Sequence, residues 1–217
     1  MDGLMFNTER LYYRAGDRLL ARRGKAMSPE LANAMMGLRS AEALEVMRRW
    51  HGLTDAIEAL ANETRELYLA LMEEHLEPMP GLMTLLDLLE RRRIPRAVAT
   101  SSRRLYVDKA LGQWDLRGRF AFVLSAEDVT HGKPHPEIYL AAAERFDIAP
   151  REMLVLEDSQ AGLRSAKAAG ALCVIIPHEH NVGQDFSQAD ACLAALDAPQ
   201  LLQWFDGEDG RGVTRDK

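Results

Sequence analysis

The sequence predicts an α/β fold with a parallel sheet and a block of helices inserted near its start. Two observations predict it. From about residue 82 onward, short apolar runs typical of buried strands alternate with segments of helical periodicity. Such alternation is typical of βαβ units with right-handed crossovers. Residues from about 10 to 76 contain helical patterns and no strand candidate. We therefore expect a core domain over 1–13 and 77–217 and a helical domain over 14–76.

The first third of the chain is expected to form four helices. In the first of them, from about residue 10, a 3.6-residue periodicity places Leu11, Ala15 and Leu19 on one face. The second begins at a Ser-Pro-Glu start and ends at a glycine, which are ordinary helix boundaries. Prolines and a glycine after the fourth helix mark the return to the core. The last three helices are expected over 28–36, 40–50 and 54–74, and the return over 76–81.

The remainder of the chain is expected to alternate between helices and strands. Apolar runs of three to six residues are typical of buried strands, whereas longer amphipathic segments are typical of the helices between them. We expect strands over 96–100, 122–124, 153–156 and 171–176. The helices are expected over 82–92, 105–111, 136–146 and about 160–169, and a frayed tail over 206–217.

Composition excludes several classes of function. The formal net charge is −6, which disfavours a nucleic acid or an anionic membrane as partner. No run approaches the ~20 apolar residues of a membrane span, and we expect no secretory signal. Cys173 and Cys192 lie far apart among apolar neighbours. We therefore expect buried, reduced thiols in a cytoplasmic protein.

Two adjacent carboxylates, Glu157 and Asp158, follow the apolar run 153–156 directly, and Ser159 can cap a helix that ends at Gly170. In open parallel sheets, ligands bind at the carboxyl ends of strands. Buried acids at such a place are costly unless a cation lies beside them, which predicts a Mg²⁺ site with oxygen ligands. The alternative is an acidic first turn that suits the helix dipole.

Two further polar segments lie at expected strand ends. Thr100, Ser101 and Ser102 follow the strand 96–100 and offer hydroxyl and N–H donors for a phosphate. Lys133 lies in a proline-stiffened loop and is a candidate fixed cation. Taken alone, the first segment can be a simple helix cap and the second a solvated lysine. Hydroxyl, ammonium and carboxylate groups on one edge of one sheet instead predict a phosphate site.

These segments, taken together, resemble the four motifs of the haloacid dehalogenase superfamily in order and spacing. The helical block resembles the cap domain of the branch that contains β-phosphoglucomutase and small sugar-phosphate phosphatases. The resemblance implies a Rossmann-like, three-layer α/β core with a parallel sheet and an inserted four-helix cap. The motifs are Asp2-Gly3, Thr100-Ser101-Ser102, Lys133-Pro134 and Glu157-Asp158-Ser159.

The resemblance implies a Mg²⁺-dependent phosphatase that acts through an aspartyl-phosphate. Asp2 would be the acid that protonates the leaving oxygen and later activates water. Thr100 and Lys133 would be catalytic, and with Ser101 they would bind the phosphoryl group. The Mg²⁺ ligands would be Glu157, Asp158 and the backbone carbonyl of Asp2.

One part of the family pattern does not lie within residues 1–217. The nucleophilic aspartate would immediately precede Met1, and the first strand of the family would precede it. We expect a start assigned to an internal methionine rather than a retired enzyme, because the later motifs are intact. Residues 1–217 alone are expected to be poorly stable and inactive as a phosphatase.

Candidate substrate contacts are Arg39, in a linker between helices of the insert, and His135 and Arg103 near the sheet edge. A guanidinium suits sugar hydroxyls or a second phosphate. The expected partner is a small phosphorylated metabolite, with no obligate protein partner. A phosphomutase is the first alternative, since it shares nearly all motifs. A non-catalytic phosphosugar-binding protein is the second.

Overall fold

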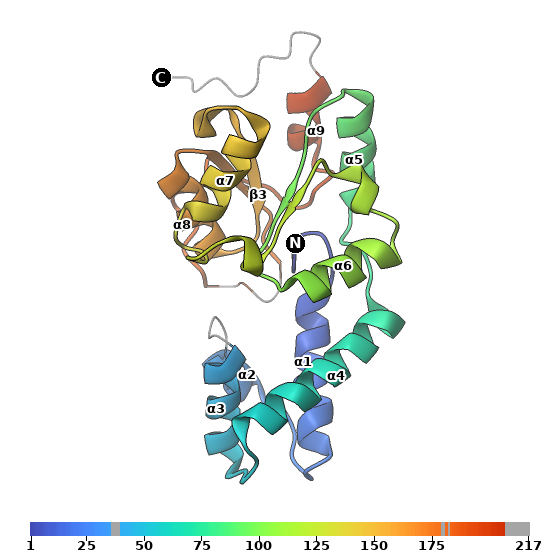
Figure 1. The fold of residues 1–217 in the computed structure, drawn as a ribbon, viewed down its shortest axis with the longest axis vertical. Helices are drawn as coiled ribbons and strands as arrows, with labels where there is room; N and C mark the ends of the chain where they lie inside the picture. The colour runs from blue at the N-terminus through green and yellow to red at the C-terminus, as the bar shows by residue number, and fades with distance from the viewer. Residues whose placement is uncertain (36–39, 179–180, 182, 207–217) are drawn as a thin grey trace. The chain divides into compact units, whose positions relative to one another are not determined.

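The computed structural model describes residues 1–35, 40–178, 181 and 183–206. The chain divides into two compact units, a core unit of Met1–Phe6 with Glu77–Lys217 and a helical unit of Asn7–Leu76 (Figure 1). The sequence pattern placed the start of the insert at residue 14. The helical unit starts earlier because α1 (Thr8–Ala21) runs without a break through that position.

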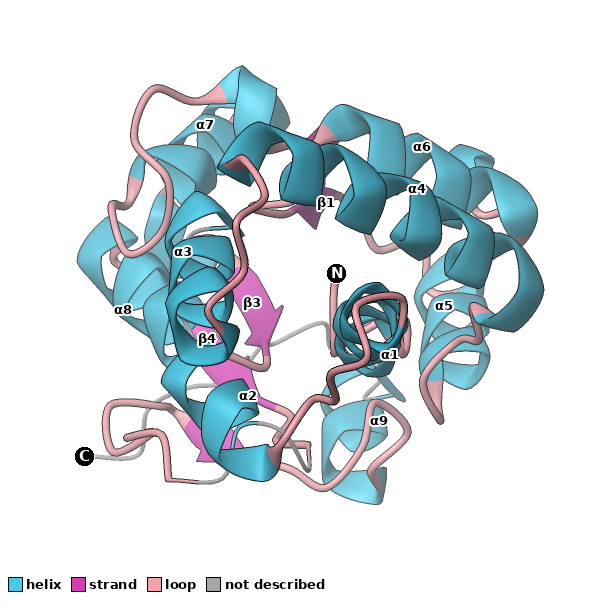
Figure 2. Ribbon diagram, turned by 90° about the horizontal axis from the view of Figure 1, so that it is seen from below, coloured by secondary structure: helices cyan, strands magenta, loops and turns pink. Residues whose placement is uncertain are grey.

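The helical unit contains α1, α2 (Pro29–Met35), α3 (Ser40–His51) and α4 (Ile57–His75). Helix α1 packs on α4, α2 packs on α3, and α3 also packs on α4 (Figure 2). The apolar stripe of α1 that the periodicity predicts is buried, including Leu11, Ala15 and Leu19. Tyr12 stacks on Tyr68 of α4 with ring centroids 3.9 Å apart. Burial of these facing stripes holds the unit together.

The core unit has the predicted alternation of strands and helices. Its helices are α5 (Leu82–Arg91), α6 (Arg104–Gln113), α7 (Glu137–Phe146), α8 (Gln160–Ala169) and α9 (Pro199–Asp206). Short 3₁₀ turns cover Arg117–Arg119, Ala126–Asp128 and Pro150–Glu152. The strands are β1 (Val98–Ala99), β2 (Val123–Leu124), β3 (Leu154–Glu157), β4 (Leu172–Ile175) and β5 (Ala191–Cys192).

Every strand pairing in the described residues is parallel. Strand β1 pairs with β2, with Val98 opposite Val123, and β3, β4 and β5 form a second sheet in that order. Helices α7 and α8 lie to one side of the strands and α5 and α9 to the other (Figure 1). The parallel α/β fold class is therefore confirmed, and β5 is an addition to it.

A cluster of buried side chains between α7, α8 and the strands forms the core beneath the candidate site. Val155 and Cys173 contribute from β3 and β4, and Ile138 and Leu163 from the helices. Cys173 is buried, as expected, and is a free thiol. Cys192 was expected to be buried but is exposed, because it lies on the edge strand β5. Both cysteines are free.

Two short segments of the core unit lie side by side where the helical unit is inserted. Phe6 forms a bridge with Pro78, and the Met79 N–H donates to the Met5 carbonyl at 2.8 Å. Within the helical unit, the Asn7 side chain donates to the His75 carbonyl at 3.2 Å. In the described part of the chain, no helix is both long and apolar enough to cross a membrane.

Candidate active site

The segment after β1 places two hydroxyl groups on the carboxylate of Asp2. The Ser102 hydroxyl donates to Asp2 Oδ2 at 2.6 Å, and the Thr100 hydroxyl donates to the same oxygen at 3.2 Å. The Ser102 N–H in turn donates to Thr100 Oγ1 at 3.1 Å, which orients the threonine. Thr100 is only 3% exposed. The polar end of β1 therefore holds one oxygen of Asp2 in a fixed position.

The second oxygen of Asp2 is buried and has no hydrogen-bond partner in the described structure. An unsatisfied buried acceptor costs about 1–3 kcal/mol. Native structures leave few such groups, and those that remain often serve a ligand or an ion. Asp2 Oδ1 is therefore available to a proton donor or to a cation.

Lys133 is held by two acceptors from different strands. Its ammonium donates to the Ala99 carbonyl at 3.1 Å and to Glu157 Oε1 at 2.5 Å. The Tyr139 hydroxyl donates to the same Glu157 oxygen at 2.6 Å. The side chains of Lys133 and Glu157 are 9% and 7% exposed. Lys133, Tyr139 and Glu157 thus form a buried, hydrogen-bonded triad.

Burial raises the pKa of Glu157, but the charges of Lys133 and of the amino group of Met1, with the hydrogen bonds from Lys133 and Tyr139, outweigh burial and lower that pKa to about 2. Burial, together with the charge of Glu157, raises the pKa of Tyr139 well above its ordinary value. At neutral pH the carboxylate is therefore ionised and the phenol remains a donor. The triad therefore holds the ammonium of Lys133 in place.

The turn after β3 encloses the other oxygen of Glu157. The Ser159 hydroxyl donates to Glu157 Oε2 at 3.1 Å, and the N–H groups of Asp158 and Ser159 lie 3.2 and 3.3 Å from it. Ser159 also accepts from the Gly162 N–H at 3.0 Å and so caps α8, as predicted. A Cβ on Gly162 would lie 2.0 Å from the Glu157 carboxyl carbon. Only glycine fits there.

Asp158 has a separate set of partners. Its Oδ2 lies 3.0 Å from His178 Nε2, and its backbone carbonyl accepts from Asn181 Nδ2 at 2.6 Å. Gly3 (φ +66°) lies against the same carboxylate, since a Cβ there would be 2.5 Å from Asp158 Oδ2. The N-terminal segment is therefore in contact with the ends of both β1 and β3.

The residues at this edge fit a hard divalent cation. Asp158 lies against the residue that follows Asp2, and Asp2 has one unsatisfied oxygen. Carboxylate and carbonyl oxygens are the ligands that Mg²⁺ prefers. Glu157 differs from the other two acids, because donors already occupy both of its oxygens. Direct ligation by Glu157 would require one of these donors to move.

The other predicted residues lie apart from this cluster or outside the described structure. Ser101 is exposed, and its neighbour Ser102 contacts Asp2 instead. Arg103 is exposed at the start of α6, and His135 is exposed in the Lys133 loop. Arg39 lies outside the described residues.

Sequence reasoning missed three residues, Tyr139, His178 and Asn181, and it assigned the phosphoryl group to Ser101 rather than to its neighbour Ser102. His178 and Asn181 follow β4 at the same edge of the sheet as the other strand ends. The rule used for Thr100, that ligands bind at the carboxyl ends of parallel strands (the strand-end rule), could have found both.

Three comparisons place this geometry among known proteins. Residues 1–176 match the family described as "Haloacid dehalogenase-like hydrolase". The chain is 31% identical over 203 residues to a phosphorylated carbohydrates phosphatase of Thermotoga maritima, covering 93% of each chain. It is 33% identical over 202 residues to a probable pseudouridine-5'-phosphatase of Drosophila melanogaster, covering 90% of this chain and 87% of that one.

A solved structure from Thermotoga maritima, described as that of a candidate β-phosphoglucomutase, superposes with a TM-score of 0.82. It is 28% identical in sequence, and the match covers 94% of each chain. Fold, strand-end polar groups and sequence similarity over nearly the whole chain lead to one assignment. The chain belongs to the haloacid dehalogenase-like hydrolase family.

Proposed function

We propose that the protein is a Mg²⁺-dependent phosphatase that acts on a small phosphorylated metabolite, such as a sugar phosphate, through an aspartyl-phosphate. The observation that carries the proposal is the carboxylate of Asp2, held through one oxygen by two hydroxyl groups while the other oxygen is buried and unsatisfied. The similarity to phosphatases, among them the phosphorylated carbohydrates phosphatase of Thermotoga maritima, supports it.

Asp2 is suited to proton transfer because Thr100 and Ser102 fix the carboxylate without using Oδ1. In the proposed reaction, Asp2 Oδ1 donates a proton to the leaving alkoxide oxygen and then accepts one from the attacking water. The hydroxyls of Thr100 and Ser102 are also donors that phosphoryl oxygens can take over. Charge that develops on those oxygens is stabilised by donors already in place.

Lys133 supplies a fixed positive charge. An ammonium has three N–H donors, and two of them have partners in Ala99 and Glu157. The third is available to the phosphoryl group. Mg²⁺, bound by Asp158 and the backbone carbonyl of Asp2, would neutralise the charge of the phosphoryl oxygens and allow a carboxylate to approach. Glu157 anchors Lys133 and directly precedes Asp158, the carboxylate proposed to bind the ion.

The proposed nucleophile is an aspartate two positions before Asp2, a position that precedes Met1. We therefore expect no phosphate ester hydrolysis from residues 1–217 alone. A chain extended by the residues encoded upstream, ending in aspartate before Met1, is expected to be active with Mg²⁺. The matched control carries asparagine at that aspartate and should bind phosphate without turnover. Turnover by residues 1–217 alone would contradict the proposed nucleophile.

The substrate class can be tested with a panel of sugar phosphates, glycerol phosphate and nucleoside monophosphates, with released phosphate as the readout. Asp2→Asn in the extended chain should abolish turnover while the fold, measured by circular dichroism, is kept. A panel without any turnover by the folded, extended, Mg²⁺-loaded chain would refute the phosphatase assignment. Stabilisation by a sugar phosphate in that same panel would then favour a binding protein.

A phosphomutase is the second candidate, and the structural similarity to a candidate β-phosphoglucomutase favours it. The test is glucose 1-phosphate with and without a trace of the corresponding bisphosphate. A mutase converts the substrate to glucose 6-phosphate only when the bisphosphate primes it. A phosphatase releases phosphate under both conditions.

A further inference from the structure

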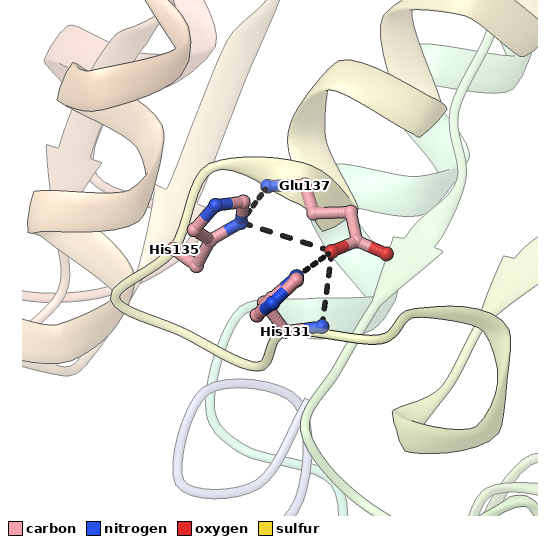
Figure 3. A group of neighbouring side chains, drawn as sticks. All are labelled: His131, His135 and Glu137. Carbon is pink, nitrogen blue, oxygen red and sulfur yellow. Dashed lines mark hydrogen bonds and ion pairs between the residues drawn. The ribbon is translucent and has the colours of Figure 1, made fainter.

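The loop that carries Lys133 also carries a second group of ligand-type side chains, which are His131, His135 and Glu137 (Figure 3). Their ligand atoms all lie within 4.8 Å of one another. Both imidazoles face one carboxylate oxygen. His131 Nδ1 is 2.9 Å from Glu137 Oε2, and His135 Nδ1 is 3.8 Å from it. The group is accessible, since 62%, 50% and 30% of the three side chains are exposed.

The surrounding backbone orients this group. The Thr130 N–H donates to Glu137 Oε1 at 2.6 Å, and the His131 N–H donates to Oε2 at 2.9 Å. These hydrogen bonds, the one from Thr130 first, lower the pKa of Glu137, so that its carboxylate is ionised. The Glu137 N–H donates to His135 Nδ1 at 3.3 Å, which favours the tautomer with its proton on Nε2. A cation would replace this N–H at the lone pair of Nδ1. Such outer contacts position ligands in metal sites.

The spacing suits a first-row transition cation. With bonds of about 2.05 Å, the ligands of a tetrahedral Zn²⁺ lie roughly 3.3 Å apart. The two nitrogen–oxygen distances, 2.9 and 3.8 Å, lie on either side of that value. Adjustments of about half an ångström are within the reach of exposed side chains. Two imidazoles and a carboxylate favour Zn²⁺ over Mg²⁺, which prefers oxygen ligands only.

Two features of the loop oppose a cation. Glu137 is the first residue of α7, and the helix dipole disfavours a cation at a helix N-terminus. The ionised carboxylate between the cation and the helix offsets this cost. Glu137 could also serve only to hold the loop through the N–H groups of Thr130 and His131. His131 Nδ1 also lies within hydrogen-bond distance of that carboxylate, and His135 Nδ1 faces the same oxygen from 3.8 Å, so both imidazoles are placed to share a cation with it.

We propose that residues 131–137 form a binding site for one Zn²⁺-class cation, ligated by Nδ1 of His131, Nδ1 of His135 and the carboxylate of Glu137, with the remaining position open to solvent. The two histidines flank Lys133, two residues away on each side. The far end of the loop is tied to α8, where the Ser165 hydroxyl donates to the His135 carbonyl at 2.7 Å. Metal binding would therefore rigidify the loop that presents Lys133.

The test is isothermal titration of tag-free protein with ZnCl₂, with Mg²⁺ in large excess to occupy sites made of oxygen ligands. We expect one Zn²⁺ per chain. His131→Asn and His135→Asn should each weaken binding at least ~10-fold, as even outer partners of metal ligands do. His75→Gln removes an exposed histidine elsewhere and should leave binding unchanged. Asp158→Asn should also leave it unchanged.

Co²⁺ gives an independent readout, because Co²⁺ in a tetrahedral site with nitrogen ligands absorbs visible light. Zn²⁺ should displace the Co²⁺ and abolish that absorption. Glu137→Gln keeps an acceptor for the Thr130 N–H but removes the charge, and it should abolish the Co²⁺ spectrum. Wild-type affinity in both histidine variants would overturn the proposal. So would loss of binding in Asp158→Asn, which would place the ion at the other edge cluster. Neither result depends on phosphatase activity.

Discussion

Gly162→Ala is predicted to be strongly destabilising, although alanine is the better helix former. A Cβ at this position would lie 2.0 Å from the Glu157 carboxyl carbon and 2.1 Å from each carboxylate oxygen. Ordinary contact begins at 3.4 Å, so the carboxylate would have to move by about 1.4 Å. A shift of that size breaks the bonds from Lys133 and Tyr139, which are 2.5 and 2.6 Å long.

The magnitude follows from two terms. Overpacking a filled site costs about 1–3 kcal/mol, and breaking a buried ion pair costs about 3–5 kcal/mol. The gain in helix propensity of up to ~1 kcal/mol opposes them. Because the site can relax in part, we expect the free energy of unfolding to fall by roughly 2–4 kcal/mol. Urea unfolding followed by circular dichroism measures it.

Gly112→Ala is the matched control. Gly112 also lies in a helix, but a Cβ there has no neighbour within 4 Å. The same substitution should therefore raise the free energy of unfolding by about 0.5–1 kcal/mol. The difference between the two variants isolates the clash with Glu157. Equal effects, or a Gly162→Ala variant within 0.5 kcal/mol of the wild type, would refute the reasoning.

Three further predictions concern hydrogen-bonded side chains. Tyr139→Phe removes a donor to the buried carboxylate of Glu157 and should lower the free energy of unfolding by about 1.5–3 kcal/mol in urea; no change would show that the triad does not need the phenol. Asn181→Ala should cost about 1–3 kcal/mol and increase amide exchange after β4, because two backbone groups lose their partner; unchanged exchange would contradict this. The pKa of Glu63 is lowered, chiefly by the hydrogen bond from Arg23. The stability that this ion pair contributes is therefore present above the ordinary carboxyl pKa and is lost as pH falls through the lowered pKa of Glu63. In the wild type, amide exchange in α1 and α4 should therefore become faster as pH falls, and this pH dependence should be weaker in Arg23→Gln. Identical pH profiles in the two proteins would contradict the prediction.

Much of the fold could be predicted because its signals are local. The end of α8 at Gly170 has a local cause, since the backbone of that glycine adopts the left-handed conformation with φ +86°. The ends of α5, α6 and α7 fall within two residues of the predicted ones. Strand β1 is shorter than the run 96–100, because only Val98 and Ala99 pair with β2. Strand β5 lies at the start of the apolar run 191–196, which the sequence analysis did not assign to a strand, and its two residues are defined by their pairing with β4, a tertiary effect.

The candidate site was predictable as far as the strand-end rule reaches. That rule selects Thr100, Glu157 and Asp158, and the structure places each at the end of a strand. It cannot distinguish Ser101 from Ser102, because which hydroxyl reaches Asp2 depends on the turn. Tyr139 lies on a helix, where a buried aromatic residue is ordinarily read as packing. Its hydroxyl acquires a role only because the fold brings it within 2.6 Å of Glu157, the last residue of β3.

The insertion point of the helical unit has a consequence for how the chain can be rearranged. The chain leaves the core unit after Phe6 and re-enters it at Glu77, and Phe6 is paired with Pro78 by a backbone bridge. A short turn between Phe6 and Glu77 could therefore close the core without disturbing that pairing. The helical unit is joined at its own ends by Asn7 and His75. The helical unit can thus be exchanged for that of a relative while the core unit keeps its sequence, and the reverse exchange is equally possible.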